Sequence, residues 1–210
     1  MAAFRRRSFG ASPPEHSAVP ETTAPITLEP DAFLYPGSNI ECPLHLGRGS
    51  RVNGPLSARG TGKVYIGRYA AIGCHVTIIT SEHHIEYPNL QERLQRRIGA
   101  RSILTPGRTV TLGHNCWIGD NVIILRKADI GIGAVIGAGS VVTKPIPDFA
   151  IAVGNPARVL RYRFPEEIIA FLLECRWWEW DEEKMRRNKE FFETDLTKIE
   201  SAKALRNLIQ

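Results

Sequence analysis

Residues 112–142 read LGHNCWIGDNVIILRKADIGIGAVIGAGSVV, and an aliphatic residue stands at every sixth position of this stretch. Those positions are Leu112, Ile118, Ile124, Ile130, Ile136 and Val142. A glycine follows most of them, and the fourth residue after most of them is small or β-branched. An amphipathic helix repeats apolar residues every three or four positions and a half-buried strand every two, so neither explains a period of six.

A strict six-residue repeat indicates one short strand and one corner per repeat, which is typical of a parallel β-solenoid. Three repeats form a triangular coil of roughly 18 residues whose aliphatic side chains stack inward. We expect the following glycine to supply a backbone conformation that a Cβ penalises. The same period recurs upstream at Ile66, Ile72 and Ile78, and more weakly at Ile40, Leu46 and Val52.

The chain is therefore predicted to be mainly β, in three parts. Residues 1–30, rich in Arg, Ser and Pro, are expected to be a disordered tail, with a transit peptide as the alternative. Residues 31–160 are expected to form a β-helix domain, interrupted at 80–108 by a long excursion that loses the repeat and is expected to be functional. Residues 161–210 form a helical cap that covers the open end of the solenoid.

Local signals place the helices within this plan. In the excursion, Leu90, Leu94 and Ile98 fall at helical spacing. Residues 165–173 begin with proline and two glutamates, which suit a first helical turn. Asp181 is a suitable N-cap for a second cap helix that runs to about Phe192.

The composition excludes several classes of protein. The 210 residues are 43% hydrophobic and 23% charged, which is ordinary for a globular domain. The sequence contains no run of about 18 uncharged apolar residues, so no membrane span is predicted. We expect a cytoplasmic protein. A net charge of +5 does not indicate nucleic-acid binding, but it suits small polyanions such as nucleotides. The four cysteines contain no C-x-x-C pair, so neither a disulfide framework nor a structural zinc site is expected.

Two groups of residues carry candidate chemistry. Glu82, His83 and His84 open the excursion, and a histidine beside a carboxylate is a candidate general base at neutral pH. The alternative is a pair of ordinary surface histidines. Near the end of the solenoid, Lys144, Arg158 and Arg161 form either a phosphate-binding cluster or a solvated basic rim.

From about Val64 to Asn188 the chain resembles the hexapeptide-repeat acyltransferases. It is most similar to the xenobiotic acetyltransferases, which include the streptogramin and chloramphenicol enzymes, and to the polysaccharide O-acetyltransferases. The match is carried by the Ile-Gly repeats and by Cys116-Trp117-Ile118-Gly119, Gly137-Ala138-Gly139-Ser140-Val141-Val142-Thr143-Lys144, Gly154-Asn155-Pro156-Ala157 and Trp177-Trp178-Glu179-Trp180.

This resemblance implies a left-handed parallel β-helix and a homotrimer with each active site in the cleft between neighbouring helices. It implies acetyl-CoA as cosubstrate, no metal, and direct transfer to a hydroxyl or amine with His84, or else His83, as base. By position in this resemblance, Asp120 and Ala138 correspond to residues that contact the pantetheine of the coenzyme, and Thr143 and Lys144 to residues nearer its nucleotide. Arg158 and Arg161 correspond to arginines that bind phosphate. Trp117 corresponds to a wall of the acyl pocket, or it is a packing residue only.

The acceptor is expected to be a sugar, glycan or nucleotide sugar, with an antibiotic as the alternative. The segment Ser81-Glu82-His83-His84-Ile85 departs from the antibiotic enzymes, and Arg93, Arg96, Arg97 and Arg101 suggest an acidic acceptor. Two other classes stay open: a zinc enzyme resembling β-helical carbonic anhydrases, using His75, His83, His84 and His114, and a non-catalytic assembly subunit. Neither a nucleic-acid partner nor a membrane span is expected.

Overall fold

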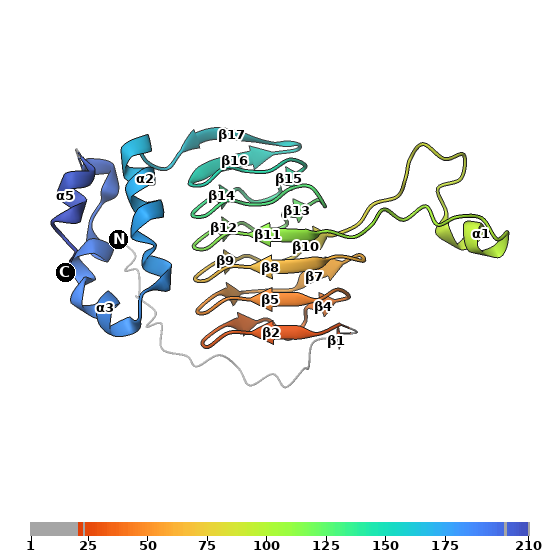
Figure 1. The fold of residues 1–210 in the computed structure, drawn as a ribbon, viewed down its shortest axis with the longest axis horizontal. Coiled ribbons are helices and arrows are strands. Elements are labelled where there is room, and N and C mark those ends of the chain that lie inside the picture. The colour runs from red at the N-terminus through yellow and green to blue at the C-terminus, as the bar shows by residue number, and fades with distance from the viewer. Residues whose placement is uncertain (1–20, 23, 200, 210) are drawn as a thin grey trace, which may run out of the picture.

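The computed structural model describes residues 21–22, 24–199 and 201–209, and they form a parallel β-solenoid followed by helices (Figure 1). Its short strands make three sheets, which we call sheets A, B and C. Sheet A holds β1 (Glu21–Thr22), β4 (Asn39–Ile40), β7 (Leu56–Arg59), β10 (Val76–Ile79), β13 (Ile123–Ile124) and β15 (Val141–Val142). Sheet B holds β2 (Ile26–Leu28), β5 (Leu44–Leu46), β8 (Lys63–Ile66) and β11 (Thr109–Leu112). Sheet C holds β3 (Phe33–Leu34), β6 (Arg51–Val52), β9 (Ala71–Ile72), β12 (Trp117–Ile118), β14 (Val135–Ile136), β16 (Ala150–Gly154) and β17 (Ala157–Tyr162).

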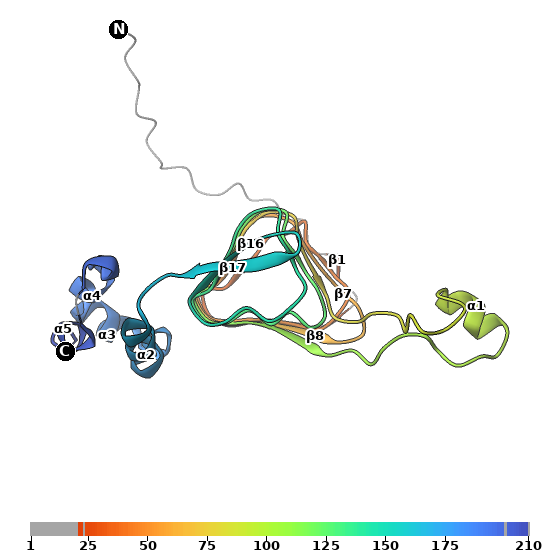
Figure 2. The ribbon, with the colours of Figure 1, turned by 90° about the horizontal axis from the view of Figure 1, so that it is seen from above.

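The chain visits the sheets in the order A, B, C, so each coil is a triangle with three corners (Figure 2). The six-residue repeat sets the register between coils. Ile66 lies beside Leu112, and Ile72 lies beside Ile118. These side chains have no exposed surface and form one continuous core. The parallel β-helix predicted from the repeat is confirmed.

The reason for the repeat glycines differs from our expectation. Those that follow the core aliphatic residues do not have a positive φ. A Cβ on Gly113 would instead lie 2.6 Å from the backbone nitrogen of Ile132 in the next coil. A Cβ on Gly67 would lie 2.7 Å from the backbone nitrogen of His114. Glycine is needed here because successive coils approach each other too closely for a side chain.

The left-handed backbone falls two residues after these glycines, at the corners between sheets B and C and between sheets C and A, and side chains occupy several of these positions. At the corner between sheets B and C, Tyr69 has φ 56° and Phe149 has φ 54°. Such values are rare for bulky residues and persist where the surroundings hold them. The ring of Tyr69 lies 5.5 Å from that of Trp177, and Phe149 packs in the core of the helical cap. These corners therefore support the cap.

The excursion leaves the corner between sheets A and B and extends far from the solenoid (Figures 1 and 2). It carries α1 (Glu92–Arg97), whose N-cap is Gln91, in agreement with the predicted helix. Because the two ends of the excursion return to the same corner, strands β10 and β11 continue the coil as though it were uninterrupted.

The cap contains α2 (Glu166–Cys175), α3 (Glu182–Arg187), α4 (Lys189–Glu193) and α5 (Ala202–Arg206), with single 3-10 turns at Trp177–Glu179 and Leu196–Lys198. Asp181 caps α3 as expected, by accepting a hydrogen bond from the Lys184 N–H at 2.7 Å. Asn188 divides the predicted second helix into α3 and α4.

Two expectations about the ends of the solenoid need correction. The helices lie beside the stack of coils and not over its open end, where β17 instead pairs antiparallel with β16 (Figure 1). Strands β1 and β2 fall within residues 1–30, so the solenoid begins earlier than the predicted tail boundary. Residues 1–20 of that predicted tail lie outside the described residues. Within the described ranges, no helix combines the length and apolar character that a membrane crossing requires.

Candidate functional site

The predicted general base lies at the foot of the excursion, where its two ends run antiparallel. The Glu82 N–H donates to Thr105 Oγ1 at 2.9 Å, and the Thr105 N–H donates back to the Glu82 carbonyl at 2.8 Å. The His84 N–H donates to the Ile103 carbonyl at 2.7 Å, and Ile103 is fully buried. This ladder holds the backbone of the two histidines in place.

Arg126, at the corner after β13, ties this foot to the solenoid. Its Nη2 donates to the Pro106 carbonyl at 3.0 Å, and its Nη1 lies 3.7 Å from Glu82 Oε1. The Arg126 side chain is only 17% exposed, whereas that of Glu82 is 44% exposed. Of the three predicted catalytic residues, Glu82 therefore contacts the scaffold, while the two histidines lie further along the excursion.

In both histidines the Nδ1 atom faces an oxygen acceptor. His83 Nδ1 lies 2.8 Å from the Leu90 carbonyl, which only accepts, so Nδ1 carries the hydrogen and Nε2 is left free to accept a proton. His84 Nδ1 lies 2.7 Å from Glu86 Oε1, again leaving Nε2 free when the imidazole is neutral. His84 is half-buried, whereas His83 is exposed.

The carboxylate that contacts His84 is Glu86, which was not among the predicted site residues. Its own backbone N–H, and then the imidazole of His84, hold the pKa of the Glu86 carboxyl below its usual value. A carboxylate in this position favours the protonated form of the imidazole. The sequence signal for this contact is the position of Glu86, two residues after His84.

The predicted coenzyme residues lie at several places on the solenoid. Asp120 and Ala138 occupy the corner between sheets C and A in successive coils, where the Gly139 N–H donates to the Asp120 carbonyl at 2.8 Å. The Asp120 carboxylate accepts from the Cys74 N–H at 2.7 Å, so this side chain already supports the corner. Thr143 and Lys144 lie at the corner between sheets A and B, from which the excursion leaves two coils earlier.

Trp117 and Arg161 share a cavity of about 440 Å³ on the outer side of sheet C. Tyr69 and Arg163 also line this cavity, and neither was predicted as a site residue. The six-residue repeat gives no signal for either, because one is a corner residue and the other follows β17. Arg158, although on the same strand as Arg161, does not line the cavity.

The chain does not bring all predicted residues into one pocket. The histidines leave the corner between sheets A and B, whereas Trp117 and Arg161 lie on sheet C (Figure 2). The zinc alternative has no matching cluster, since within the described residues no three His, Cys, Asp or Glu side chains lie close enough together to hold a metal.

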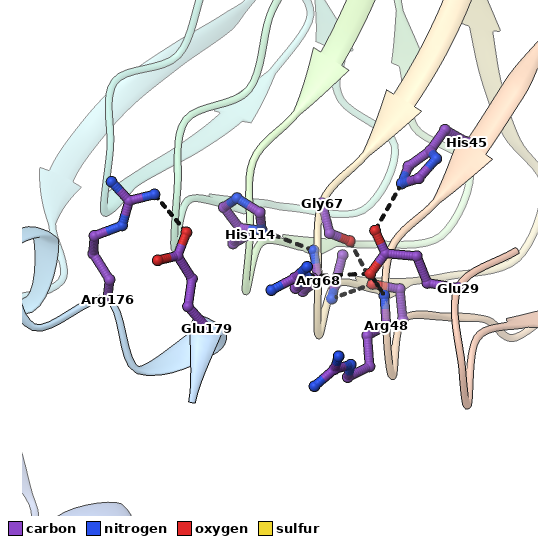
Figure 3. A network of polar contacts seen from close by, with 10 residues as sticks. Glu29, His45, Arg48, Gly67, Arg68, His114, Arg176 and Glu179 are labelled. Carbon is purple, nitrogen blue, oxygen red and sulfur yellow. Dashed lines mark hydrogen bonds and ion pairs between the residues drawn. The ribbon is translucent and has the colours of Figure 1, made fainter. Parts of the chain in front are cut away.

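A polar network at the corner between sheets B and C faces the cap (Figure 3). Glu29 Oε1 lies 3.2 Å from His45 Nε2, and Glu29 Oε2 accepts from Arg68 Nε at 3.2 Å. The Arg68 N–H donates to His114 Nδ1 at 2.9 Å, and the His114 ring stacks on Trp178 of the cap with centroids 5.5 Å apart. This network connects successive coils to the helices.

Comparisons with curated proteins and with solved structures both match the chain to acetyltransferases. No protein-family model matches the chain. It is 34% identical over 140 residues to a chloramphenicol acetyltransferase of Agrobacterium fabrum, covering 62% of this chain and 66% of that protein. It is 35% identical over 134 residues to the galactoside O-acetyltransferase of Escherichia coli K12, covering 64% and 59%. The chain thus spans less than two thirds of the length of these relatives.

Among solved structures, a hexapeptide-repeat-containing acetyltransferase of Vibrio cholerae has the same fold. Its TM-score is 0.50 at 23% identity, and the match covers 66% of this chain and 71% of that one.

Proposed function

Because the chain belongs to the hexapeptide-repeat acetyltransferase family, we propose that it transfers an acetyl group from acetyl-CoA to a hydroxyl or amine of a small acceptor. The observation that carries this proposal is the pair of histidines at the foot of the excursion, each with Nδ1 bonded to an acceptor and Nε2 free. A free, correctly oriented imidazole nitrogen is what a general base requires.

The proposed reaction begins with neutral His84. Its Nε2 accepts the proton of the acceptor hydroxyl or amine as the freed oxygen or nitrogen attacks the thioester carbonyl. The tetrahedral intermediate carries a negative oxygen, which a backbone N–H of the glycine-rich coils stabilises. Its collapse breaks the carbon–sulfur bond, and the His84 imidazolium returns the proton to the departing thiolate. No covalent intermediate on the protein is needed when the two substrates are held side by side.

Glu86 supports His84 over His83 as the base. A carboxylate offsets the positive charge that develops on the imidazole during transfer, whereas the Leu90 carbonyl facing His83 Nδ1 offers only a dipole. His83 then serves to anchor the excursion through its bond to Leu90.

We propose that the coenzyme binds between copies of the chain in a homotrimer. The histidines and the predicted coenzyme residues Trp117, Asp120 and Arg161 lie on different sides of the triangular coil. A neighbouring copy that presents its sheet C to the foot of the excursion unites them, and a threefold arrangement gives every copy one such site.

The acceptor is proposed to be a sugar, glycan or nucleotide sugar, in line with the galactoside O-acetyltransferase among the relatives. An antibiotic acceptor is the second candidate, and the chloramphenicol acetyltransferase favours it.

The test is thiol release from acetyl-CoA with a panel of galactosides, nucleotide sugars and chloramphenicol. With an acceptor found, His84→Ala is expected to lower kcat by about 10²- to 10⁴-fold, the usual worth of a general base. Binding of acetyl-CoA by calorimetry is expected to persist. His75→Asn is the matched control. His75 is exposed and has a left-handed backbone, and an asparagine occupies the same corner position in the next coil. If His83→Ala lowers kcat and His84→Ala does not, the base is His83. If both variants keep the kcat of wild type, neither histidine is the base.

A further inference from the structure

Arg126 lies on a corner of the solenoid that stacks against the foot of the excursion. This corner, residues 125–129, follows β13 one coil after the corner from which the excursion leaves. Strand pairing holds it on both sides, because β13 pairs with β10 just before the excursion, and Ile130 pairs with Leu112 just after it. The corner is therefore a fixed part of the scaffold beside both ends of the excursion.

The corner presents opposite charges to the two ends of the excursion. On the outgoing end, Glu82 Oε1 lies 3.7 Å from Nη1 of Arg126. On the returning end, Arg108 forms an ion pair with Asp129. The other carboxylate oxygen of Asp129 accepts the Thr111 N–H at 2.9 Å. Each end thus meets a charge opposite to its own, which favours one placement of the foot on the solenoid.

The guanidinium of Arg126 contacts both ends of the excursion. Its Nε and Nη2 donate to the Pro106 carbonyl at 3.3 and 3.0 Å, on the returning end. Its Nη1 faces Glu82 on the outgoing end. A guanidinium holds its donors in one rigid plane, whereas a lysine offers a single ammonium group on a flexible stem. Arg126 therefore fixes the two ends relative to each other as well as to the corner.

These contacts lead to His84 by a short route. Glu82 lies two residues before His84, and its backbone N–H and carbonyl both bond to Thr105. Pro106 follows Thr105 directly. A displacement of the groups that Arg126 holds is therefore passed to the backbone of the proposed base.

The side chains of the two histidines make their contacts inside the excursion. His83 faces the Leu90 carbonyl, and His84 faces the Glu86 carboxylate. Such contacts orient each ring within the excursion, but they do not determine where the ring lies relative to the coils. That position follows from how the foot is attached to the solenoid.

We propose that Arg126 is a positioning residue for the reaction, and that it sets the place of His84 relative to the coils by holding Glu82 and the Pro106 carbonyl. The inference rests on the proposed function and adds to it a residue outside the predicted site. Arg126 acts through the foot and not by contact with the reacting atoms. Its effect on rate follows from distance, because a misplacement of about 1 Å can cost about 10²-fold.

The first test is thiol release from acetyl-CoA with an acceptor from the panel above. Arg126→Gln is expected to lower kcat about tenfold or more, and to leave the KM for acetyl-CoA within about twofold of wild type. Arg126→Lys is expected to recover only part of kcat, because an ammonium group cannot reproduce the fork. The Glu82→Gln and Arg126→Gln double variant is expected to lose little more than the weaker single variant, since both changes break the same contact.

The second test is hydrogen–deuterium exchange, which reports the attachment of the foot without any acceptor. In Arg126→Gln the amides of His84 and Thr105 are expected to exchange faster than in wild type. The amides of Gly119 and Gly137, which bond between coils, are expected to keep their wild-type rates and so show that the solenoid is folded. If Arg126→Gln does not fold, Arg126→Lys takes its place in both tests.

Lys127→Gln is the matched control, because Lys127 is exposed on the same corner and carries the same charge. It is expected to match wild type in both measurements. Equal effects of Arg126→Gln and Lys127→Gln would overturn the inference, as would a normal kcat in Arg126→Gln or a raised KM for acetyl-CoA with normal kcat.

Unchanged exchange at the foot overturns the inference whatever happens to kcat. If the wild-type protein releases no thiol with any member of the panel, the proposed function fails. Exchange at His84 and Thr105 alone then decides whether Arg126 places the histidine.

Discussion

Gly113 shows how a single residue limits the spacing of the coils. An added Cβ would meet three backbone atoms of the next coil, Ile132 N, Gly131 C and Ile132 Cα, at 2.6 to 2.8 Å. The N–H groups of Gly131 and Ile132 are themselves bonded to the following coil, and backbone held in this way yields far less readily than the end of a flexible side chain. The repeat glycines therefore keep the strand spacing constant along the solenoid.

We predict that Gly113→Ala lowers the free energy of unfolding by about 1–3 kcal/mol, the usual cost of overpacking. The control is Gly139→Asn, because Gly139 has φ +70° with open space around its Cβ position, and Asn121 has the equivalent conformation one coil earlier. The control is expected to change stability by no more than about 0.5 kcal/mol. Denaturant unfolding measures both, and a Gly113→Ala protein as stable as wild type would show that the coils can separate.

At the scale of elements, His114 couples the solenoid to the cap. Its Nδ1 accepts the Arg68 N–H, and its ring stacks on Trp178. Burial lowers the pKa of His114, and the charges of Arg68 and Arg176 lower it further, while Glu179 and Glu29 act in the opposite direction. A protonated imidazole has no acceptor nitrogen, so protonation breaks the bond to Arg68.

The sign of the pH effect follows from that shift. Because the pKa of His114 is lower in the folded chain, the unfolded chain takes up the proton first as pH falls. The contribution to stability is complete above the unfolded pKa, about 6.5, and is lost progressively below it. We predict that the Tm of wild type falls more steeply between pH 7 and pH 5 than that of His114→Gln. Parallel curves would contradict a role for His114, and His75→Asn should match wild type.

At the scale of the whole molecule, the three-sided coil separates the two halves of the proposed site. The excursion leaves one corner, while sheet C and its cavity face another direction (Figure 2). A rigid solenoid cannot fold back to join them, because its core is continuous from the first coils to the last. The proposed reaction therefore requires that copies of the chain assemble.

We predict that two inactive variants restore activity when they assemble together. His84→Ala lacks the base and Trp117→Ala lacks the wall of the acyl pocket, but a mixed assembly contains some sites built from two intact halves. Thiol release is measured on assemblies carrying both variants, isolated through two different affinity tags. Each variant alone is the control. Mixed assemblies without recovered activity would place the whole site within one chain.

The sequence alone determined the solenoid, the excursion and the cap helices. These features follow from local patterns: the six-residue core repeat, its interruption and the helix caps. Each pattern depends on how residues close together in the sequence are buried or hydrogen-bonded. It also indicated the histidine pair, because Glu82, His83 and His84 are adjacent. The acetyltransferase family was recognisable from motifs of the same short range.

Only the tertiary structure shows why the repeat needs glycine and that the cap lies beside the coils. It alone shows which group each histidine contacts, and that Tyr69 and Arg163 line one cavity. Each depends on contacts between residues far apart in the chain, such as Arg68 with His114, which are 46 positions apart. The excursion places residues 80–108 between two strands of one coil, so sequence distance there no longer predicts which residues meet. Coil contacts are set by the stacking of strands, and stacking brings together side chains that no local pattern connects.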